Sequence, residues 1–171
     1  GKERETNSFT FADDMYYGDR DVNYDSKEAN ELSYNTFMQG EYNENDFNEG
    51  WTMCYKGIYQ ASVFIANIYR NNEMTEKERL DFKGQARFVR AYFYWLLLRR
   101  YGPVPIMPDE GVDYTKSYEQ IATPRSSYEE VANYISREMV QAAKEIQYTK
   151  RDGENIARPT KGACLATRAL A

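Results

Sequence analysis

Residues 84–106 read GQARFVRAYFYWLLLRRYGPVPI, and this stretch decides the fold. Its central part, 88–98, is apolar on nearly every side of a helix, with Arg90 as the exception. A helix that is apolar all round is buried all round, so we expect it to lie between at least two other helices. The apolar run of 11 residues is well short of the roughly 20 needed to cross a bilayer, so we do not expect this chain to cross a membrane by itself.

Local signals mark both ends of this helix, which we place at 75–100. Thr75 followed by Glu78 has the spacing of a capping box, which is typical of a helix start. The Gly-Pro pair at 102–103 ends the helix, because proline lacks a backbone N–H and its ring clashes with the preceding turn. Residues 102–106 are therefore interpreted as an extended crossover, and a polar loop follows.

Similar periodicity predicts three further helices, at 48–71, at 126–146 and from 160 to the end of the sequence. Ser126 and Glu129 have the spacing of a second capping box, and Thr160 is placed to cap the last helix. The fold class is therefore all-α, with two helix-turn-helix pairs stacked as in tetratricopeptide-like proteins. No clean repeat of the usual tetratricopeptide length is present. The sequence stops inside the last helix, so we expect a truncated piece of a longer protein.

The first part of the chain differs from the rest in charge. Residues 1–50 contain 4 Lys or Arg and 13 Asp or Glu, whereas the remainder carries a positive balance. Aromatic side chains are frequent in this acidic part, and disordered segments usually lack them. We therefore divide the chain into an irregular but ordered aromatic and acidic loop region, 1–47, and a helical scaffold, 48–171.

Composition excludes several classes of function. The net charge of −5 and the pI near 5.0 disfavour non-specific binding of nucleic acid. The chain has no histidine, which removes His general bases, His metal ligands and Ser-His-Asp catalysis. No nucleophile-elbow, P-loop or metal-binding motif is present, so we expect no enzyme activity, no cofactor and no metal.

A calcium ion is the one cofactor that the carboxylates of the acidic loop could bind, because calcium takes several oxygen ligands. The candidates are clustered carboxylates whose spacing does not match an EF-hand loop: Asp13, Asp14, Asp19, Asp21 and Asp25. We interpret them as solvated charge.

The two cysteines, Cys54 and Cys164, lie in apolar helical stretches and are interpreted as buried thiols, although a single disulfide is possible.

Two arginines and several aromatic rings are assigned to the structure of the scaffold. Arg87 and Arg90 lie on an otherwise apolar helix, so we expect them to pair with carboxylates or with helix C-terminal carbonyls. Five aromatic residues have helical spacing and are expected in the core rather than on a binding surface: Trp51, Tyr55, Phe88, Phe93 and Trp95.

Residues 13–24 combine aromatic and polar side chains on the predicted loop, as a sugar-binding site does. Flat rings can cover the C–H faces of a sugar, and Asp, Asn or Arg can bind its hydroxyl groups. The candidate ligand-binding residues are Asp13, Asp14, Tyr16, Tyr17, Arg20, Asn23 and Tyr24. The alternative is that these rings hold the loop on the helices while the carboxylates face water.

Residues 84–106 also resemble the signature of the SusD/RagB family, which is roughly G-x-A-x-F-[LV]-R-A-x-x-Y-x-x-L-x-x-x-Y-G-x-V-P. The stretch W-x-x-x-Y-x-x-I from Trp51, the helix at 126–146 and the sequence RPTKGA from Arg158 are similar to further family motifs in the same order. The resemblance covers about 48–171, whereas 1–47 agrees with the family only in character.

This resemblance implies a function at the cell surface. Family members are surface-exposed outer-membrane lipoproteins of Bacteroidetes that bind oligosaccharides, or in some cases peptides. They pass the ligand to a TonB-dependent, SusC-like transporter in the outer membrane. The resemblance implies membrane attachment only through a lipid anchor, which we expect to be absent from this stretch of sequence. The alternatives are a tetratricopeptide-like scaffold for protein partners, a peptide-binding member of the same family, and an isolated fragment without activity.

Overall fold

The computed structural model describes residues 50–109 and 115–171, which belong to the compact unit Glu49–Ala171. Its longer helices are α2 (Gly50–Asn67), α3 (Glu76–Tyr101), α5 (Tyr128–Glu145) and α6 (Lys161–Leu170). Its short ones are the 3-10 turns η3 (Ile68–Arg70) and η4 (Gly153–Asn155) and the single turn α4 (Tyr118–Ile121). The described residues contain no strand, which confirms the all-α class. The loop region 1–47 lies outside them.

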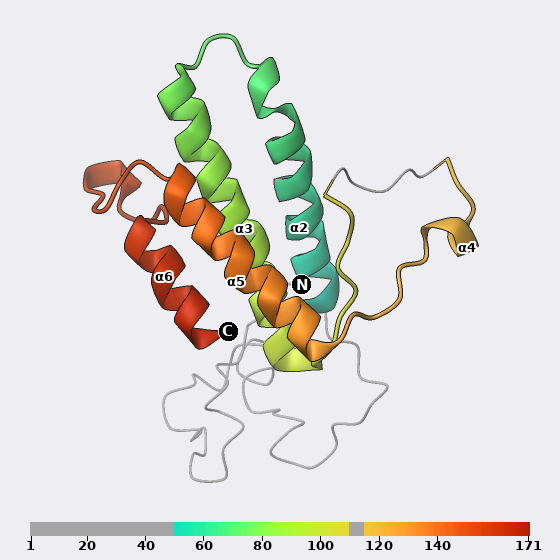
Figure 1. The fold of residues 1–171 in the computed structure, drawn as a ribbon. Helices are drawn as coiled ribbons and strands as arrows, with labels where there is room; N and C mark the ends of the chain where they lie inside the picture. Colours follow the sequence, from blue (N-terminus) through green and yellow to red (C-terminus); the bar gives the residue numbers. More distant parts are fainter. Residues whose placement is uncertain (1–49, 110–114) are drawn as a thin grey trace, which may run out of the picture. The chain divides into compact units, whose positions relative to one another are not determined.

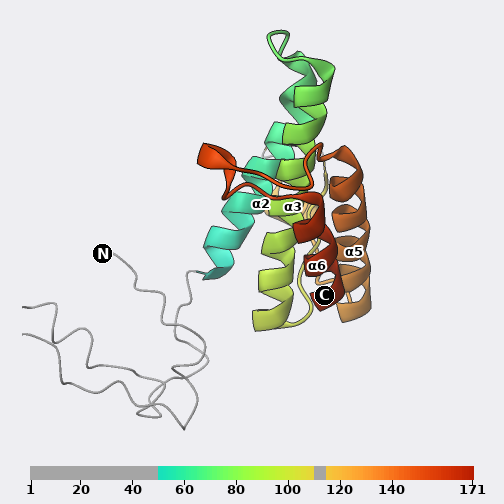
Figure 2. The same cartoon turned by 90° about the vertical axis from the view of Figure 1, so that its left-hand side faces the viewer.

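Helix α3 lies in the middle of this unit, with α2 packed along one side and α5 along the other (Figure 1). Its inward residues Ala91, Tyr94 and Leu97 are fully buried. Figure 2 shows α6 beside α5, and these two helices also pack together. The prediction that the apolar helix lies between at least two others is confirmed.

The predicted start of α3 is confirmed at the level of single hydrogen bonds. The side chain of Thr75 accepts a bond from the Glu78 amide at 3.3 Å, and the Glu78 carboxylate accepts one from the Thr75 amide at 2.8 Å. Thr160 likewise caps α6, because its hydroxyl oxygen accepts a bond from the Ala163 amide. Both helices therefore begin where the local sequence places them.

The predicted start of α5 at Ser126 is wrong by one residue. The capping box is formed by Ser127 and Glu130, and the Ser126 amide donates instead to the carbonyl of Val104 at 3.2 Å. The pair Ser126-Ser127 is followed by Glu129-Glu130, so the local pattern fits either serine. The hydrogen bond to Val104 holds Ser126 outside the helix and decides between them.

We expect Ser127→Ala to lower the free energy of unfolding by about 1 kcal/mol, because it removes the cap of α5. The neighbouring variant Ser126→Ala is the matched control and should change stability by less. Urea unfolding of both variants measures the difference. Equal losses would contradict the assignment of Ser127 as the cap.

Smaller differences from the predicted helices lie at their ends. The helix predicted to reach residue 71 ends its α-helical part at Asn67 and continues as the 3-10 turn η3. The loop predicted between the crossover and α5 contains the short helix α4. These are weak local features whose hydrogen bonds span a single turn, so hydrophobic periodicity does not reveal them.

Both cysteines are buried and form no disulfide, which confirms their interpretation as buried thiols. Burial raises the pKa of the Cys164 thiol to about 11, which keeps it protonated at neutral pH. Within the described ranges, no helix combines the length and the apolar character that a membrane span requires.

A crossover strap and a hollow beside helix α5

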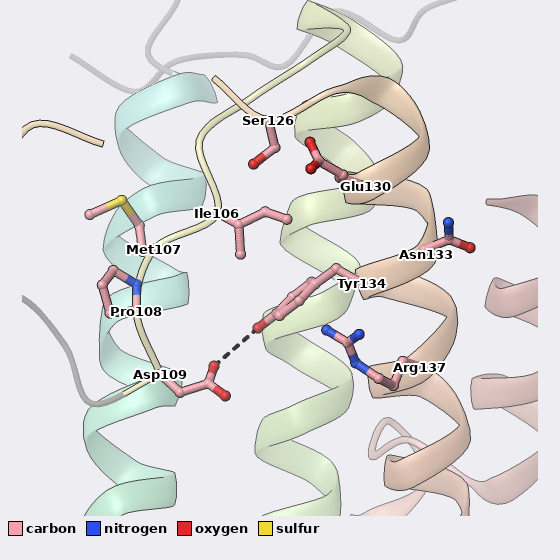
Figure 3. A pocket seen from close by; sticks show the side chains of 9 residues that line it. All are labelled: Ile106, Met107, Pro108, Asp109, Ser126, Glu130, Asn133, Tyr134 and Arg137. Atoms are coloured by element: carbon pink, nitrogen blue, oxygen red, sulfur yellow. Dashed lines mark hydrogen bonds between the residues drawn. The ribbon is translucent and has the colours of Figure 1, made fainter. Parts of the chain in front are cut away.

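The predicted crossover is an extended segment, residues 102–109, which we call the strap. It leaves the end of α3 and passes between α2 and α5 (Figure 3). Hydrogen bonds from two sides hold its proline carbonyls. The Pro103 carbonyl accepts a bond from the Arg125 guanidinium at 2.6 Å, and the Pro105 carbonyl accepts one from the Tyr55 hydroxyl at 2.8 Å.

Helix α3 holds the next part of the strap. The Met107 amide donates to the Tyr94 hydroxyl oxygen at 2.9 Å, and the Val104 side chain is completely buried. Burial raises the pKa of Tyr94 to about 12, so its hydroxyl is neutral at physiological pH. Together with the bond between Ser126 and Val104, these contacts fix the path of the strap on its helices.

A hollow of about 520 Å³ opens between the strap and the first half of α5 (Figure 3). Ile106, Met107 and Pro108 of the strap supply apolar surface. Three charged side chains, Asp109, Glu130 and Arg137, stand around it. The full lining is Ile106, Met107, Pro108, Asp109, Ser126, Glu130, Asn133, Tyr134 and Arg137.

Asp109 connects this hollow to the interior of the helical unit. Its side chain is 62% exposed, yet its Oδ1 lies 2.9 Å from Nη1 of Arg90, which is only 1% exposed. The Tyr134 hydroxyl donates to the same carboxylate oxygen at 3.4 Å (Figure 3). The contacts with Arg90 and Tyr134 therefore fix the position of the Asp109 carboxylate.

Arg90 belongs to a buried network of charges between α3 and α5. Nη2 of Arg90 lies 2.6 Å from the Glu138 carboxylate, which also accepts from Arg87 at 2.9 Å. Arg87 in turn binds Glu145 at 3.0 Å. Arg90 Nη1 also donates to the Ser62 hydroxyl oxygen on α2. The prediction that both arginines pair with carboxylates is confirmed.

The neighbours of Arg90 and Tyr134 shift the pKa values of both groups. Burial alone would lower the pKa of Arg90, but Tyr134, Glu138 and Asp109 outweigh burial and raise it. Burial raises the pKa of Tyr134 well above its usual value, so the ring carries a neutral hydroxyl. The Asp109 carboxylate oxygen therefore lies between the Arg90 guanidinium and the Tyr134 hydroxyl donor.

Arg137 stands on the outer side of the hollow. Its guanidinium lies over the Tyr134 ring, 5.7 Å from the ring centre. Within residues 50–109 and 115–171, Arg137 forms no ion pair, so its N–H groups remain available as donors.

The candidate ligand-binding residues Asp13, Asp14, Tyr16, Tyr17, Arg20, Asn23 and Tyr24 lie outside the described residues, as do the acidic candidates for calcium. The hollow was not predicted from the sequence. Its helical part could have been recognised from the spacing of Glu130, Tyr134 and Arg137, which places them on one face of α5. The predicted core aromatics Trp51, Tyr55, Phe88, Phe93 and Trp95 do pack against the core, each partly buried.

Within the described ranges, no three His, Cys, Asp or Glu side chains form a group that could hold a metal ion.

Comparison with family models extends to residues outside the described ranges. A family model described as "starch-binding associating with outer membrane" matches residues 5–170. The chain belongs to the SusD-like family.

Individual SusD-like proteins agree with this assignment over shorter stretches. A SusD-like protein of Formosa agariphila is 29% identical over 55 residues, which make up 32% of this chain and 10% of the relative. The structure of a SusD-like protein of Bacteroides fragilis has a TM-score of 0.63 at 25% identity, and the match covers 71% of this chain and 23% of that one.

Surface glycan-binding protein A of Bacteroides uniformis shares the fold at a TM-score of 0.66 and 21% identity. That match covers 78% of this chain and 29% of the other. This SusD-like chain therefore spans less than a third of the length of each of these relatives.

Proposed function

We propose that the protein to which this chain belongs is a surface-exposed lipoprotein that binds an oligosaccharide at the outer membrane and passes it to a TonB-dependent, SusC-like transporter. The observation that carries the proposal is the family match, which extends over residues 5–170 and is described as starch-binding with outer-membrane association. A similar fold in a surface glycan-binding protein supports it. The proposal assigns no catalytic step to the chain.

In this proposal the helices are the scaffold that docks on the transporter. The strap is bonded to side chains from α2 and α3, and buried ion pairs join α3 to α5, so hydrogen bonds and ion pairs connect these helices to one another.

The ligand contacts are proposed to include the loop residues named from the sequence: Asp13, Asp14, Tyr16, Tyr17, Arg20, Asn23 and Tyr24. Tyrosine rings would cover sugar C–H faces, and the polar side chains would bind hydroxyl groups.

Isothermal titration of the full-length protein with maltoheptaose, β-glucan oligosaccharides and xyloglucan oligosaccharides tests the proposal. We expect a saccharide to bind, and Tyr16→Ala or Tyr17→Ala to weaken its affinity roughly tenfold through the loss of a stacking ring. Tyr128→Ala is the matched control, because this exposed tyrosine lies on α5 outside the hollow. The melting temperature should stay unchanged in all three variants.

Two outcomes would count against the proposal at different levels. Unchanged affinity in both loop variants would contradict the site assignment but leave the saccharide function standing.

Binding of short peptides, with no binding of any saccharide, would favour the second candidate, a scaffold for peptide or protein partners. The observation that favours this candidate is the exposure of several large apolar side chains on α2: Met53, Tyr59, Val63 and Phe64.

A further inference from the structure

We infer that the hollow between the strap and α5 is a saccharide subsite of the helical unit itself, which takes one uncharged sugar residue. This inference rests on the proposed function and names a second place of contact, on the helical scaffold rather than on residues 13–24.

The floor of the hollow suits the apolar face of a sugar ring. The Ile106 side chain extends from the strap toward α5 (Figure 3), and Met107 and Pro108 of the same strap also line the hollow. The Tyr134 ring is buried beneath them and contributes its hydroxyl contact with Asp109 rather than an open face. Sugar rings carry C–H groups on their faces, and such groups pack favourably on aliphatic and aromatic surface. The volume of about 520 Å³ falls within the range of roughly 300–1,000 Å³ typical of small-ligand sites.

The rim offers both kinds of hydrogen-bonding group that sugar hydroxyls need. Asp109 and Glu130 are acceptors, and Arg137 is a donor. Hydrogen bonds with Ser127 lower the pKa of Glu130, so its carboxylate is ionised and accepts from a hydroxyl. A hydroxyl group both donates and accepts, so adjacent hydroxyls of one sugar can satisfy the carboxylates and the guanidinium together.

The charge balance favours an uncharged ligand. An anionic ligand bound by Arg137 would face the carboxylates of Asp109 and Glu130, and a cationic ligand bound by those carboxylates would face Arg137. Like charges placed close together in a partly desolvated site disfavour binding. A neutral sugar avoids both penalties.

Two of the three charged groups on the rim, Asp109 and Glu130, are held in place by contacts within the helical unit. Arg90 and Tyr134 hold Asp109, and the α5 capping box holds Glu130 through Ser127. Groups held in place before binding lose little conformational entropy when the ligand arrives. The hollow therefore has a formed polar geometry and not merely exposed polar side chains.

The test uses the full-length protein, the oligosaccharide series named above and two readouts. Titration compares Arg137→Ala and Glu130→Gln with the control Arg158→Ala, which removes another exposed arginine lying over a ring, that of Phe82. Methyl NMR of isotope-labelled isoleucine follows the Ile106 methyl group, assigned by its loss in Ile106→Val.

We expect Arg137→Ala to weaken the affinity for the longer saccharides about tenfold, as the loss of a hydrogen bond to a charged group does. Arg158→Ala should leave it unchanged, and the Ile106 methyl signal should shift in proportion to saturation. Saccharide binding without an Ile106 shift and with unchanged affinity in Arg137→Ala would overturn the subsite while the proposed function stands. No saccharide binding by the unaltered protein would overturn both.

Discussion

Glu138→Ala should lower the free energy of unfolding by about 3–5 kcal/mol, the largest effect that we expect from a single substitution. The Glu138 carboxylate is the shared partner of Arg87 and Arg90, and it is nearly buried. Its removal leaves the Nη2 group of the almost completely buried Arg90 without its carboxylate, while Nη1 keeps its contact with Asp109. A buried charged donor that has lost its acceptor destabilises a protein far more than the loss of a solvent-exposed ion pair does.

Urea unfolding measures this effect, read as a shift of the midpoint at constant slope. Glu129→Ala on the same helix is the matched control, because Glu129 is exposed in the first turn of α5 and should contribute at most about 1 kcal/mol through the helix dipole. Similar losses for Glu129 and Glu138 would contradict the role that we assign to the buried network.

Gly84→Ala should lower the free energy of unfolding by about 2 kcal/mol. A Cβ atom at Gly84 would lie 2.8 Å from the backbone nitrogen of Ile146 and 2.9 Å from its Cγ1, where α3 passes the end of α5. Backbone cannot yield as a side chain can, so overpacking by about 3 kcal/mol outweighs the helix preference for alanine of about 1 kcal/mol.

The control for this prediction is Gly162→Ala in α6. A Cβ atom there meets only the Thr160 hydroxyl oxygen, at 3.8 Å, which is ordinary contact. We expect this variant to be neutral or slightly more stable in the same urea experiment. A stabilising Gly84→Ala would show that the two helices can move apart without loss.

The features that could be predicted from the sequence are those fixed by nearby residues. The helix placed at 75–100 is evident from the apolar character of its second half, and the caps at Thr75 and Thr160 follow from spacing alone. The prediction that Arg87 and Arg90 pair with carboxylates or with helix C-terminal carbonyls followed from their position on an apolar helix. In each case the physical cause lies within a few residues of its effect.

The features that could not be predicted depend on residues far apart in the chain. Glu138 lies 48 positions from Arg90, and the pairing depends on how α3 and α5 cross. The hollow needs the strap to pass beside α5, and the choice of Ser127 over Ser126 needs the carbonyl of Val104. Periodicity and local motifs contain no information on such crossings.

The strap has a consequence for the way in which this unit comes apart. In an ideal helical repeat array each hairpin touches only its neighbours, so hairpins can unzip one after another from an end. Here the Tyr55 hydroxyl, on the first hairpin, donates to the carbonyl of Pro105, 50 positions along the chain. The Ser126 amide, just before the second hairpin begins, donates to the carbonyl of the neighbouring Val104. Unfolding of either hairpin therefore breaks a hydrogen bond to the strap, which is bonded to both hairpins. We expect the two hairpins to unfold together rather than one after the other.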